Sequence, residues 1–341
     1  MLRSQNWSYV LVEGILLVGG FGTRLRPLTN HRPKPMLPIA SLPVTEHQLA
    51  MARRAGIKRI VLATSYLSEV FIPYFGDGSK WGMEIKYAVE KEPMGTGGAI
   101  RNAAKELSGA QQVVIFNGDV LSSHDLNAQL DLHIKSHADV TLHLTPVEDA
   151  RAYGCVPTNS DGQVTAFLEK MENPVTNTIN AGCYVFDKSI IESIPENEVV
   201  SVERQTFPQL IAANKKVMGF IEKAYWLDIG TPNALMKGSR DLVTGAADGD
   251  ALDNYKFSHR DREYVSLSEN ISGLFTNGSA IGAHCTLQDC QVEGSIISDG
   301  VEAEGCIIKN SFIEIGARLA PNSVIENSFV DPDGEISPLF T

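Results

Sequence analysis

The residues with the clearest capacity for chemistry lie near the start of the chain, where a glycine-rich loop is followed by fixed positive charges. The loop follows the continuous apolar run Ile15–Val18, and its glycines are Gly19, Gly20 and Gly22. Because glycine has no side chain, successive backbone N–H groups in such a loop can point at anionic oxygens. Arg24 and Lys34 then add cationic side chains. The segment therefore predicts a binding site for a polyphosphate.

The spacing within this loop excludes two common phosphate-binding motifs. No Gly-Lys-Ser/Thr follows at the distance of a Walker A motif, and Leu25 stands where a dinucleotide-binding fingerprint has its third glycine. A tight turn after the strand is the alternative interpretation of the three glycines taken alone.

The elements that must position this loop alternate between strands and helices. The patterns predict strands at residues 59–64, 83–89 and 113–116 and helices at 45–54, 66–75 and from 95 onward. Strands become more frequent after residue 138, with strands expected at 138–147, 163–170 and 179–186 and helices at 204–214 and 232–244. Such alternation implies a mostly parallel sheet with ligands at the carboxyl ends of its strands.

Length and composition indicate a soluble globular protein of two domains. The 341 residues are 43% hydrophobic and 21% charged, and the net charge of -12 argues against a nucleic-acid-binding surface. Five scattered cysteines without a C-x-x-C pair predict reduced thiols. The segment at 11–18, which is apolar apart from Glu13 and Gly14, is too short to span a membrane. Together with the reduced thiols, this leads us to expect a cytoplasmic location without membrane partners.

The C-terminal region has a period of its own. Apolar residues recur at a spacing of six at positions 281 and 287 and again at 301, 307, 313, 319 and 325. A spacing of six predicts a three-sided coil, as in hexapeptide β-helices. A few strands of an ordinary sandwich are the alternative.

The extended loop sequence identifies a family resemblance. The string Gly-Gly-x-Gly-Thr-Arg-Leu-x-Pro-Leu-Thr, followed by Pro-Lys-Pro-Met at residues 33–36, resembles the signature of the sugar-1-phosphate nucleotidyltransferases, also called nucleoside-diphosphate-sugar pyrophosphorylases. The resemblance implies a Rossmann-like α/β fold with a short left-handed β-helix of hexapeptide repeats. The expected domains are an N-terminal extension at 1–13, a nucleotidyltransferase domain at 14–244, a linker at 245–265 and the β-helix at 266–341.

The reaction implied by this resemblance is attack by a sugar 1-phosphate on the α-phosphorus of a nucleoside triphosphate, with release of pyrophosphate. The nucleophile is already ionised near neutral pH, so the protein must mainly align anions and neutralise charge. In the family, the positions of Asp119 and Asp228 hold Mg²⁺, which suits a site of few carboxylates. Arg24 would hold the β- and γ-phosphates and Lys34 would offset charge at the α-phosphate. A turn or helix-cap carboxylate is the alternative for Asp119.

The resemblance also implies two larger sets of contacts. The expected nucleotide-binding residues are Gly19, Gly20, Gly22, Thr23, Arg24, Glu90, Gly95 and Thr96. The expected sugar-phosphate contacts are Gly154, Glu169, Lys170, Asn180 and Gly182. A Glu-Lys pair is otherwise an ordinary surface pair.

Base choice is expected to depend on Glu90 in the segment EKEPMGTGG. Guanine presents its N1–H and N2–H₂ donors side by side, and an ionised carboxylate accepts from both. This segment resembles the guanylyltransferases that act on mannose 1-phosphate, so GTP and mannose 1-phosphate are the expected substrates. A solvated charge at a strand end is the alternative for Glu90.

Other functions remain as alternatives. These are a uridylyl- or thymidylyltransferase acting on glucose 1-phosphate, a non-catalytic regulatory paralogue that binds nucleotide sugar, and a coil-based acyltransferase. His133 and His137 have helical spacing but lack the glutamate of H-E-x-x-H, so solvent-facing histidines are expected. His284 alone is weak support for an acyltransferase. Packing of the coil predicts a homo-oligomer, a dimer or higher.

Overall fold

The computed structural model describes residues 11–20, 22–30, 32–64 and 68–340. The chain forms two compact units, each assembled from segments distant in sequence. The first unit takes the described parts of residues 1–19, 52–118 and 124–224, and the second takes those of 20–51, 119–123 and 225–341. Residues 1–10 of the expected N-terminal extension lie outside the described residues. The first strand begins at Val12, so the end of that extension, placed at residue 13, falls inside the strand.

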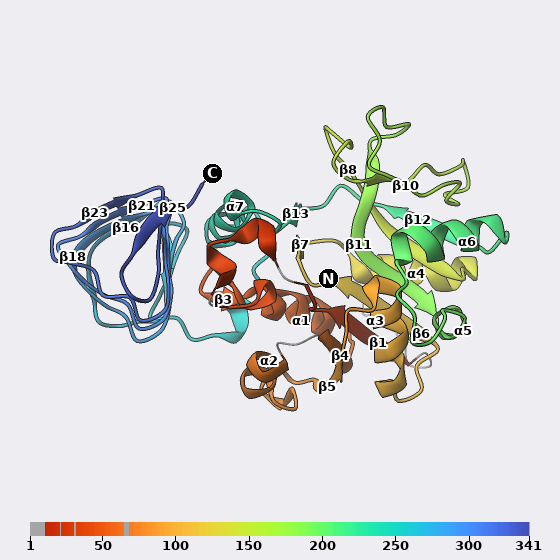
Figure 1. Cartoon of the computed structure of the whole chain (residues 1–341), viewed down its shortest axis with the longest axis horizontal. Helices are drawn as coiled ribbons and strands as arrows, with labels where there is room; N and C mark the ends of the chain where they lie inside the picture. The colour runs from red at the N-terminus through yellow and green to blue at the C-terminus, as the bar shows by residue number, and fades with distance from the viewer. Residues whose placement is uncertain (1–10, 21, 31, 65–67, 341) are drawn as a thin grey trace, which may run out of the picture. The chain divides into compact units, whose positions relative to one another are not determined.

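The first unit is built around one large mixed sheet (Figure 1). Its strands are β1 (Val12–Leu17), β4 (Arg59–Thr64), β5 (Glu84–Val89), β6 (Gln112–Asn117), β8 (Val140–Pro146), β9 (Gly154–Cys155), β10 (Leu168–Glu169), β11 (Thr178–Asp187) and β12 (Val217–Ile221). They run in the order β10-β9-β11-β6-β1-β4-β5, with β8 joining β11 to β12. The strands β6, β1, β4 and β5 are mutually parallel, whereas β11 is antiparallel to β6 and β8.

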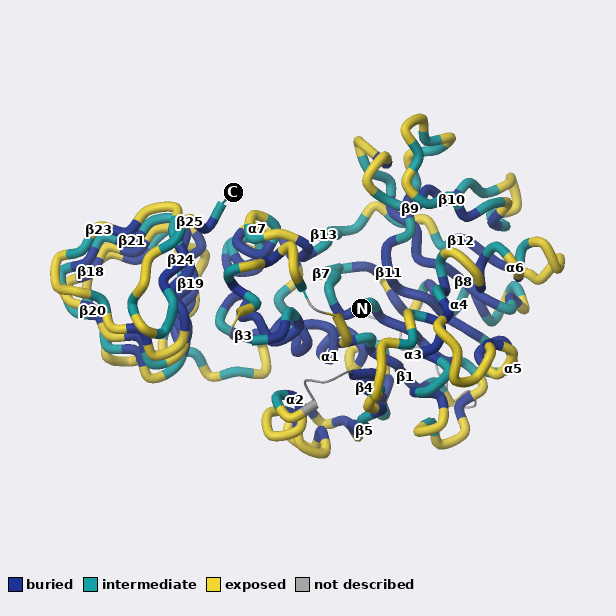
Figure 2. The backbone as a smooth tube through the Cα atoms, viewed as in Figure 1, coloured by how far each residue is buried: buried dark blue, intermediate teal, exposed yellow. Residues whose placement is uncertain are grey.

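The central strands are buried because their sequences are apolar on both faces. Residues of β1, β4 and β6 are almost all buried, and Figure 2 shows these strands in the colour of buried residues. Alternate residues such as Ile15, Val61 and Ile115 share one core cluster with the aromatic rings of Tyr184 and Phe207. A continuous apolar run is typical of a parallel strand covered on both faces. The mixed α/β fold with a mostly parallel central sheet is therefore confirmed.

Helices flank this sheet. They are α2 (Ser68–Phe75), α3 (Gly95–Ala103), α4 (Leu126–Ser136), α5 (Lys188–Glu192) and α6 (Phe207–Ala212). Helix α3 packs against β1 and β4, and α4 packs against β8 and β11. The start of α4 is fixed by the Asp125 carboxylate, which accepts a hydrogen bond from the backbone N–H of Ala128. The expected strand at 163–170 is shorter than predicted, because only β10 forms a ladder within it.

The second unit begins with short elements around the cationic loop. They are the 3₁₀ turns Thr23–Leu25, Leu28–Asn30 and Lys34–Met36, the hairpin strands β2 (Pro38–Ile39) and β3 (Leu42–Pro43), and most of helix α1 (Val44–Arg54). The same unit also contains a two-stranded ladder of β7 (Val120–Ser122) and β13 (Trp226–Asp228). Helix α7 (Pro232–Thr244) follows β13 in the sequence. Their apolar side chains form one cluster that includes Leu25, Leu121 and Ile229.

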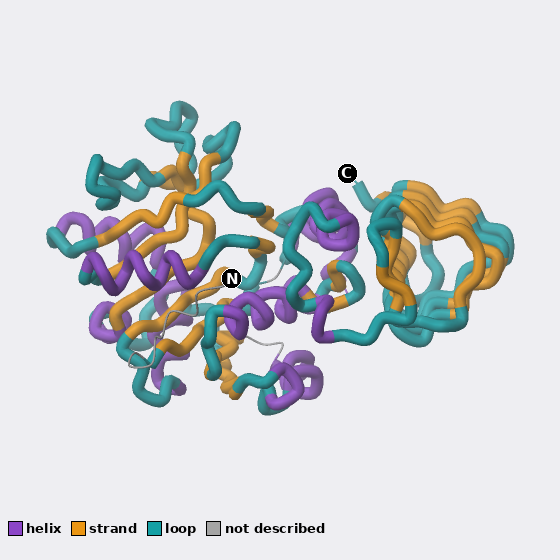
Figure 3. Tube along the Cα trace, turned by 180° about the vertical axis from the view of Figure 1, so that it is seen from behind, coloured by secondary structure: helices purple, strands orange, loops and turns teal. Residues whose placement is uncertain are grey.

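The C-terminal part of the second unit is a parallel β-helix, and Figure 3 shows its strands stacked coil upon coil. One sheet contains β15 (Tyr264–Ser266), β17 (Ser279–Ile281), β19 (Ile296–Ile297), β22 (Phe312–Ile313) and β24 (Ser328–Val330). A second contains β16 (Ile271–Thr276), β18 (Thr286–Glu293), β20 (Glu302–Glu304), β21 (Ile307–Lys309) and β23 (Val324–Glu326). The antiparallel strands β14 (His259–Arg260) and β25 (Ile336–Pro338) pair with β15 and β24. The expected β-helix is confirmed, and its left hand stays a prediction.

The length of each coil differs from the six-residue period expected. Ile281 pairs with Ile297, Ile297 with Ile313, and Ile313 with Val330, so successive coils are 16 or 17 residues apart. Three sides of six residues would give about 18. Ile307 is accordingly only partly buried, whereas the adjacent Ile308 is fully buried.

Among the described residues, no helix has both the length and the apolar character needed to cross a membrane.

Candidate active site

The two aspartates expected to bind metal lie side by side although they are 109 positions apart in the sequence. In the β7–β13 ladder, Asp228 pairs with Val120, the residue directly after Asp119. The N–H of Ile229 donates to the backbone oxygen of Asp119 at 2.8 Å. This short ladder therefore brings together Asp119 and Asp228, both within the second unit.

Gly118 determines where the chain turns toward Asp119. Its N–H donates to the backbone oxygen of Leu17, the last residue of β1, at 2.9 Å. A Cβ at position 118 would lie 2.2 Å from the same oxygen, which is closer than atoms can approach. Only glycine fits, so the sequence Asn-Gly-Asp turns tightly at the carboxyl end of β1.

Lys34 is held against Asp119. Its Nζ lies 2.7 Å from the Asp119 Oδ2, and the side chains are 12% and 38% exposed. The neighbouring prolines restrict the backbone of Lys34, and the Thr45 hydroxyl donates to the Pro35 oxygen. Lys34 also lies close to the glycine loop, because a Cβ at Gly22 would be 3.1 Å from the Lys34 Cβ. The cation, the loop and one carboxylate thus form one group.

Arg24 and Asp228 approach each other at Gly230. A Cβ at Gly230 would lie 3.1 Å from both the Arg24 Nη2 and the Asp228 Oδ2. Arg24 is exposed and comes from the first 3₁₀ turn, where Gly22 adopts the left-handed conformation with φ of 58°. The absence of a side chain at Gly230 therefore leaves room for a guanidinium beside a carboxylate.

This donor set fits a magnesium ion. Mg²⁺ is usually held by one or two carboxylates, with water and substrate phosphates completing its coordination. Asp119 and Asp228 supply two carboxylates at adjacent strands, with Arg24 and Lys34 beside them to contact phosphate oxygens. Within the described ranges, no group of three or more His, Cys, Asp or Glu side chains could hold a metal ion.

The expected sugar-phosphate contacts gather in the first unit, along β9, β10 and β11. Gly154 pairs with Glu169 across β9 and β10, and a Cβ at Gly154 would lie 3.2 Å from the Glu169 Oε1. Lys170 follows directly and is exposed, with a positive φ of 42° and its N–H donating to the Tyr153 oxygen. A positive φ is strained for lysine, and such strain is concentrated at functional positions.

Asn180 and Gly182 lie at an irregularity in β11. The pairing of β11 with β8 shifts register between Asn180 and Tyr184, and Gly182 has a positive φ of 78°. The Asn180 Oδ1 accepts from the Gly182 N–H, and its Nδ2 donates to the Tyr184 hydroxyl at 2.8 Å. A bulge of this kind turns backbone groups out of the ladder, as is common next to active sites.

Glu90 follows β5 and has a carboxylate oxygen without a partner. Its Oε1 is buried and makes no hydrogen bond, and burial raises the pKa of the carboxyl group while the Met94 N–H lowers it. A buried acceptor without a partner is costly unless a ligand satisfies it. This environment fits recognition of a donor-rich base edge.

Gly95 and Thr96 are engaged within the protein. A Cβ at Gly95 would lie 2.6 Å from the Val200 oxygen, and the Thr96 hydroxyl donates to Glu203 and accepts from the Val202 N–H. Their residue types are therefore explained by the packing of the segment at 200–203. Gly19, Gly20 and Thr23 are exposed in the loop.

The histidines differ from the solvent-facing pair expected. His133 is buried, where its Nδ1 bonds the Thr141 hydroxyl at 3.0 Å, so this prediction is wrong for His133. The reason is that α4 packs His133 against β8. His137 is exposed and ends the helix in the left-handed conformation, and His284 is exposed in the β-helix.

The expected site residues of both units could be named from the sequence, but two close contacts could not. The phosphate and metal residues of the second unit and the sugar residues of the first were all named from motif strings. The roles of Gly118 and Gly230 as close-contact positions were missed. Their only signal was a glycine beside each aspartate, in Asn-Gly-Asp and Asp-Ile-Gly.

Comparison with known proteins identifies relatives of this chain. The chain is 46% identical to a mannose-1-phosphate guanylyltransferase of Mycobacterium tuberculosis, over 87% of this chain and 83% of that protein. It is 40% identical to a D-glycero-alpha-D-manno-heptose 1-phosphate guanylyltransferase of Aneurinibacillus thermoaerophilus, over 68% of this chain and 98% of that protein.

A crystal structure of HddC from Yersinia pseudotuberculosis has a similar fold, with a TM-score of 0.59 and 30% identity over 67% of this chain and 98% of its own. The model of the nucleotidyl transferase family matches residues 13–245. The chain therefore belongs to the nucleotidyl transferase family.

Proposed function

We propose that this protein transfers the guanylyl group of GTP to mannose 1-phosphate, giving GDP-mannose and pyrophosphate in a Mg²⁺-dependent reaction. The observation that carries the proposal is the β7–β13 ladder, which pairs Asp228 with Val120 and so brings it beside Asp119, whose carboxylate lies 2.7 Å from the Lys34 Nζ. Relatives from two organisms, both named guanylyltransferases, support the choice of nucleotide.

The proposed reaction forms one bond and breaks one at the α-phosphorus of GTP. An oxygen of mannose 1-phosphate bonds to this phosphorus as the bond to the bridging oxygen of the β-phosphate breaks, and the electron pair leaves on pyrophosphate. The nucleophile is ionised already, so no side chain must remove a proton. Catalysis then consists of alignment and charge neutralisation.

Arg24 and Lys34 are proposed to act on the phosphates. The Arg24 guanidinium offers a planar fork to the β- and γ-phosphate oxygens, and Lys34 places a point charge at the α-phosphate. Asp119 and Asp228 would hold Mg²⁺, which when bound supplies positive charge that offsets the charge developing on the leaving group. Lys34, whose Nζ contacts Asp119, would exchange this partner for a phosphate oxygen.

Base and sugar selection are proposed for residues of the first unit. The unpartnered Oε1 of Glu90 supports its role as the acceptor for guanine donors. Glu169, which lies over Gly154, would accept from sugar hydroxyls. Lys170, exposed and in a strained conformation, would contact the sugar phosphate.

The test is pyrophosphate release from a matrix of substrates with and without Mg²⁺. GTP, UTP, dTTP and ATP are each paired with mannose, glucose and manno-heptose 1-phosphates. We expect the highest kcat/KM for GTP with mannose 1-phosphate and no turnover after Mg²⁺ is chelated. No turnover with any pair would favour a regulatory, non-catalytic protein, and a preference for UTP or dTTP with glucose 1-phosphate would refute the assigned substrates.

We further propose that the enzyme works in the cytoplasm as a homo-oligomer. The five cysteines are all free, as expected in a reducing compartment. Leu274 and Val324, on strands of the β-helix, are 59% and 64% exposed, which supports association through this region. Light scattering on the purified chain tests the oligomer, and a monomer at micromolar concentration would contradict it.

A further inference from the structure

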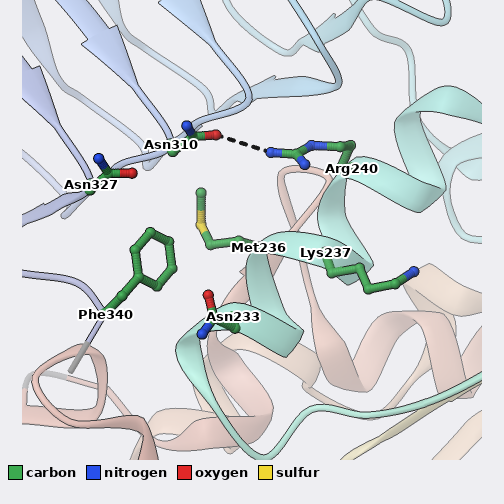
Figure 4. Close-up of a pocket in the computed structure, with 7 residues that line it drawn as sticks. All are labelled: Asn233, Met236, Lys237, Arg240, Asn310, Asn327 and Phe340. Atoms are coloured by element: carbon green, nitrogen blue, oxygen red, sulfur yellow. Dashed lines mark hydrogen bonds between the residues drawn. The ribbon is translucent and has the colours of Figure 1, made fainter.

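A cavity of about 280 Å³ lies within the second unit, between helix α7 and the corners of the β-helix. Figure 4 shows its lining. The helix contributes Asn233, Met236, Lys237 and Arg240. These positions are three or four residues apart, so they share one face of α7.

The opposite wall is a ladder of corner residues from successive coils. Asn277, Gly294, Asn310 and Asn327 occupy equivalent positions and all have positive φ angles between 52° and 56°, apart from 43° at Asn310. Asn310 and Asn327 line the cavity. Asparagine tolerates this conformation, which explains its use at the corners. As a consequence, the side-chain amides of Asn277, Asn310 and Asn327 form a column that is interrupted at Gly294, and those of Asn310 and Asn327 lie on the cavity wall opposite α7.

Arg240 lies across this column and has hydrogen-bonding capacity left over. Its Nη2 donates to the Asn310 Oδ1 at 3.1 Å, and a Cβ at Gly294 would be 2.8 Å from the same nitrogen. Its Nε is buried without a hydrogen-bond partner. A buried guanidinium N–H without an acceptor is costly, and the positive charge of the group favours an anionic ligand oxygen in the adjoining cavity.

The other lining residues indicate which chemical groups a bound anion would have besides its negative charge. Lys237 also lines the cavity, but its ammonium is paired with Asp241, lies 5.5 Å from the Tyr225 ring centre and points away from Asn327 and Phe340 (Figure 4). No acidic residue lines the cavity in the described part of the chain. The amides of Asn233, Asn310 and Asn327 can donate to and accept from hydroxyls, and Phe340 offers an aromatic ring beside them (Figure 4).

We propose that this cavity binds a phosphorylated monosaccharide. The Arg240 guanidinium would bind the phosphate, and the asparagine amides would form hydrogen bonds with the sugar hydroxyls. The Phe340 ring would pack against the apolar face of the sugar ring. Pockets for drug-sized ligands run from about 300 to 1,000 Å³. A cavity of about 280 Å³ therefore has room for one phosphorylated sugar. This binding site is separate from the proposed catalytic residues.

The experiment is calorimetric titration of the full chain with mannose 6-phosphate, glucose 6-phosphate, mannose and inorganic phosphate. Arg240→Gln removes the guanidinium, and Asn327→Asp places a negative charge at the cavity while keeping a residue that tolerates positive φ. Asn322→Asp is the matched control, because Asn322 is also an exposed corner residue with positive φ, of 61°, but does not line the cavity. Lys170→Gln removes a proposed contact of the catalytic site.

We expect a hexose 6-phosphate to bind the unmodified chain, Asn322→Asp and Lys170→Gln alike. Arg240→Gln and Asn327→Asp should each weaken binding about tenfold, as for loss of one charge-assisted hydrogen bond. Thermal unfolding checks that each variant is folded, and Asn327→Asp carries the test if Arg240→Gln is not.

Three results would overturn the proposal. The first is no saturable binding of either hexose 6-phosphate. The second is binding lost in Lys170→Gln and kept in Asn327→Asp, which would assign it to the proposed catalytic site. The third is equal affinity for inorganic phosphate, which would show that the sugar contributes nothing. The substrate matrix described above does not depend on any of these outcomes, so the two proposals fail separately.

Discussion

Replacing Gly230 by alanine tests whether Arg24 and Asp228 act together. The new Cβ would lie 3.1 Å from the Arg24 Nη2 and the Asp228 Oδ2 and 3.2 Å from the Asp228 Oδ1. Favourable contacts of a carbon atom begin near 3.5 Å, so the two side chains must move by roughly 0.4 Å. Position 230 does not have a positive φ, so alanine adds little backbone strain.

The expected effect falls on activity more than on stability. A displacement of about 1 Å in a catalytic arrangement can cost 10²-fold in rate, so a shift of roughly 0.4 Å should lower kcat/KM by about tenfold. This corresponds to about 1.4 kcal/mol of transition-state stabilisation. The concentration of Mg²⁺ that gives half-maximal rate should rise, while the melting temperature changes by less than about 3 °C.

Gly249→Ala is the matched control. It also introduces a Cβ at 3.1 Å from its nearest neighbour, but that neighbour is the Cδ1 of the buried Leu252. The assay is pyrophosphate release against Mg²⁺ concentration, with thermal unfolding of both variants. If Gly230→Ala keeps the unmodified rate and Mg²⁺ dependence, or if Gly249→Ala loses as much activity, the reasoning about Arg24 and Asp228 is refuted.

Three further predictions concern charged groups. Glu90→Gln should lower kcat/KM for GTP relative to kcat/KM for UTP. Because the pKa of Glu90 is raised, its carboxylate becomes protonated as pH falls, so the KM for GTP should rise in the unmodified enzyme but not in the variant. Identical pH profiles of KM for the two proteins would contradict this. Asp119→Asn should reduce turnover by at least about 10²-fold at saturating GTP, measured by pyrophosphate release, and unchanged turnover with unchanged Mg²⁺ dependence would argue against metal binding there. Arg32→Met should lower the free energy of unfolding, measured in urea, by about 3 kcal/mol, because it leaves the fully buried Glu314 without its ion-pair partner. Adding Glu314→Gln should recover most of the lost stability. If the two substitutions instead lower the free energy of unfolding additively, this explanation is contradicted.

Much of the first unit could be predicted from local pattern. The runs at residues 60–63 and 113–116 are apolar throughout, and they became the centres of β4 and β6. A fully buried parallel strand needs little beyond an apolar sequence of the right length. The strand expected at 163–170 largely failed, because only Leu168 and Glu169 pair with β9. Pairing over a long sequence distance leaves no local signal.

The length of a coil in the β-helix could not be predicted from spacing alone. A run of apolar residues six apart fits three sides of equal length, but the corners of this β-helix use fewer residues. The ladder that joins Ile297 to Ile313 and Phe312 to Phe329 fixes coils of 16 and 17 residues. The residues that point into the β-helix are therefore not always those that a strict period of six predicts. For example, the period predicts Ile307, but the adjacent Ile308 is the buried residue.

The candidate site was predicted by residue type and not by geometry. Motif strings named Asp119 and Asp228, but the proximity of the two side chains depends on the ladder of β7 and β13. Each of these strands has three residues, which is too short to recognise in a sequence. The partner of Thr96 was likewise invisible, since Glu203 lies 107 residues away. Distant side chains meet only through the fold.

The antiparallel strands at the two ends of one sheet of the β-helix have a consequence for solubility. A solenoid of stacked parallel strands exposes unpaired backbone groups at its ends and can join another copy end to end. Here β14 and β25 run against the direction of the stack, and Pro338 in β25 has no N–H to offer. The strand at each end of this sheet therefore does not match the parallel strand that a second molecule would present, and this disfavours end-to-end growth into fibres.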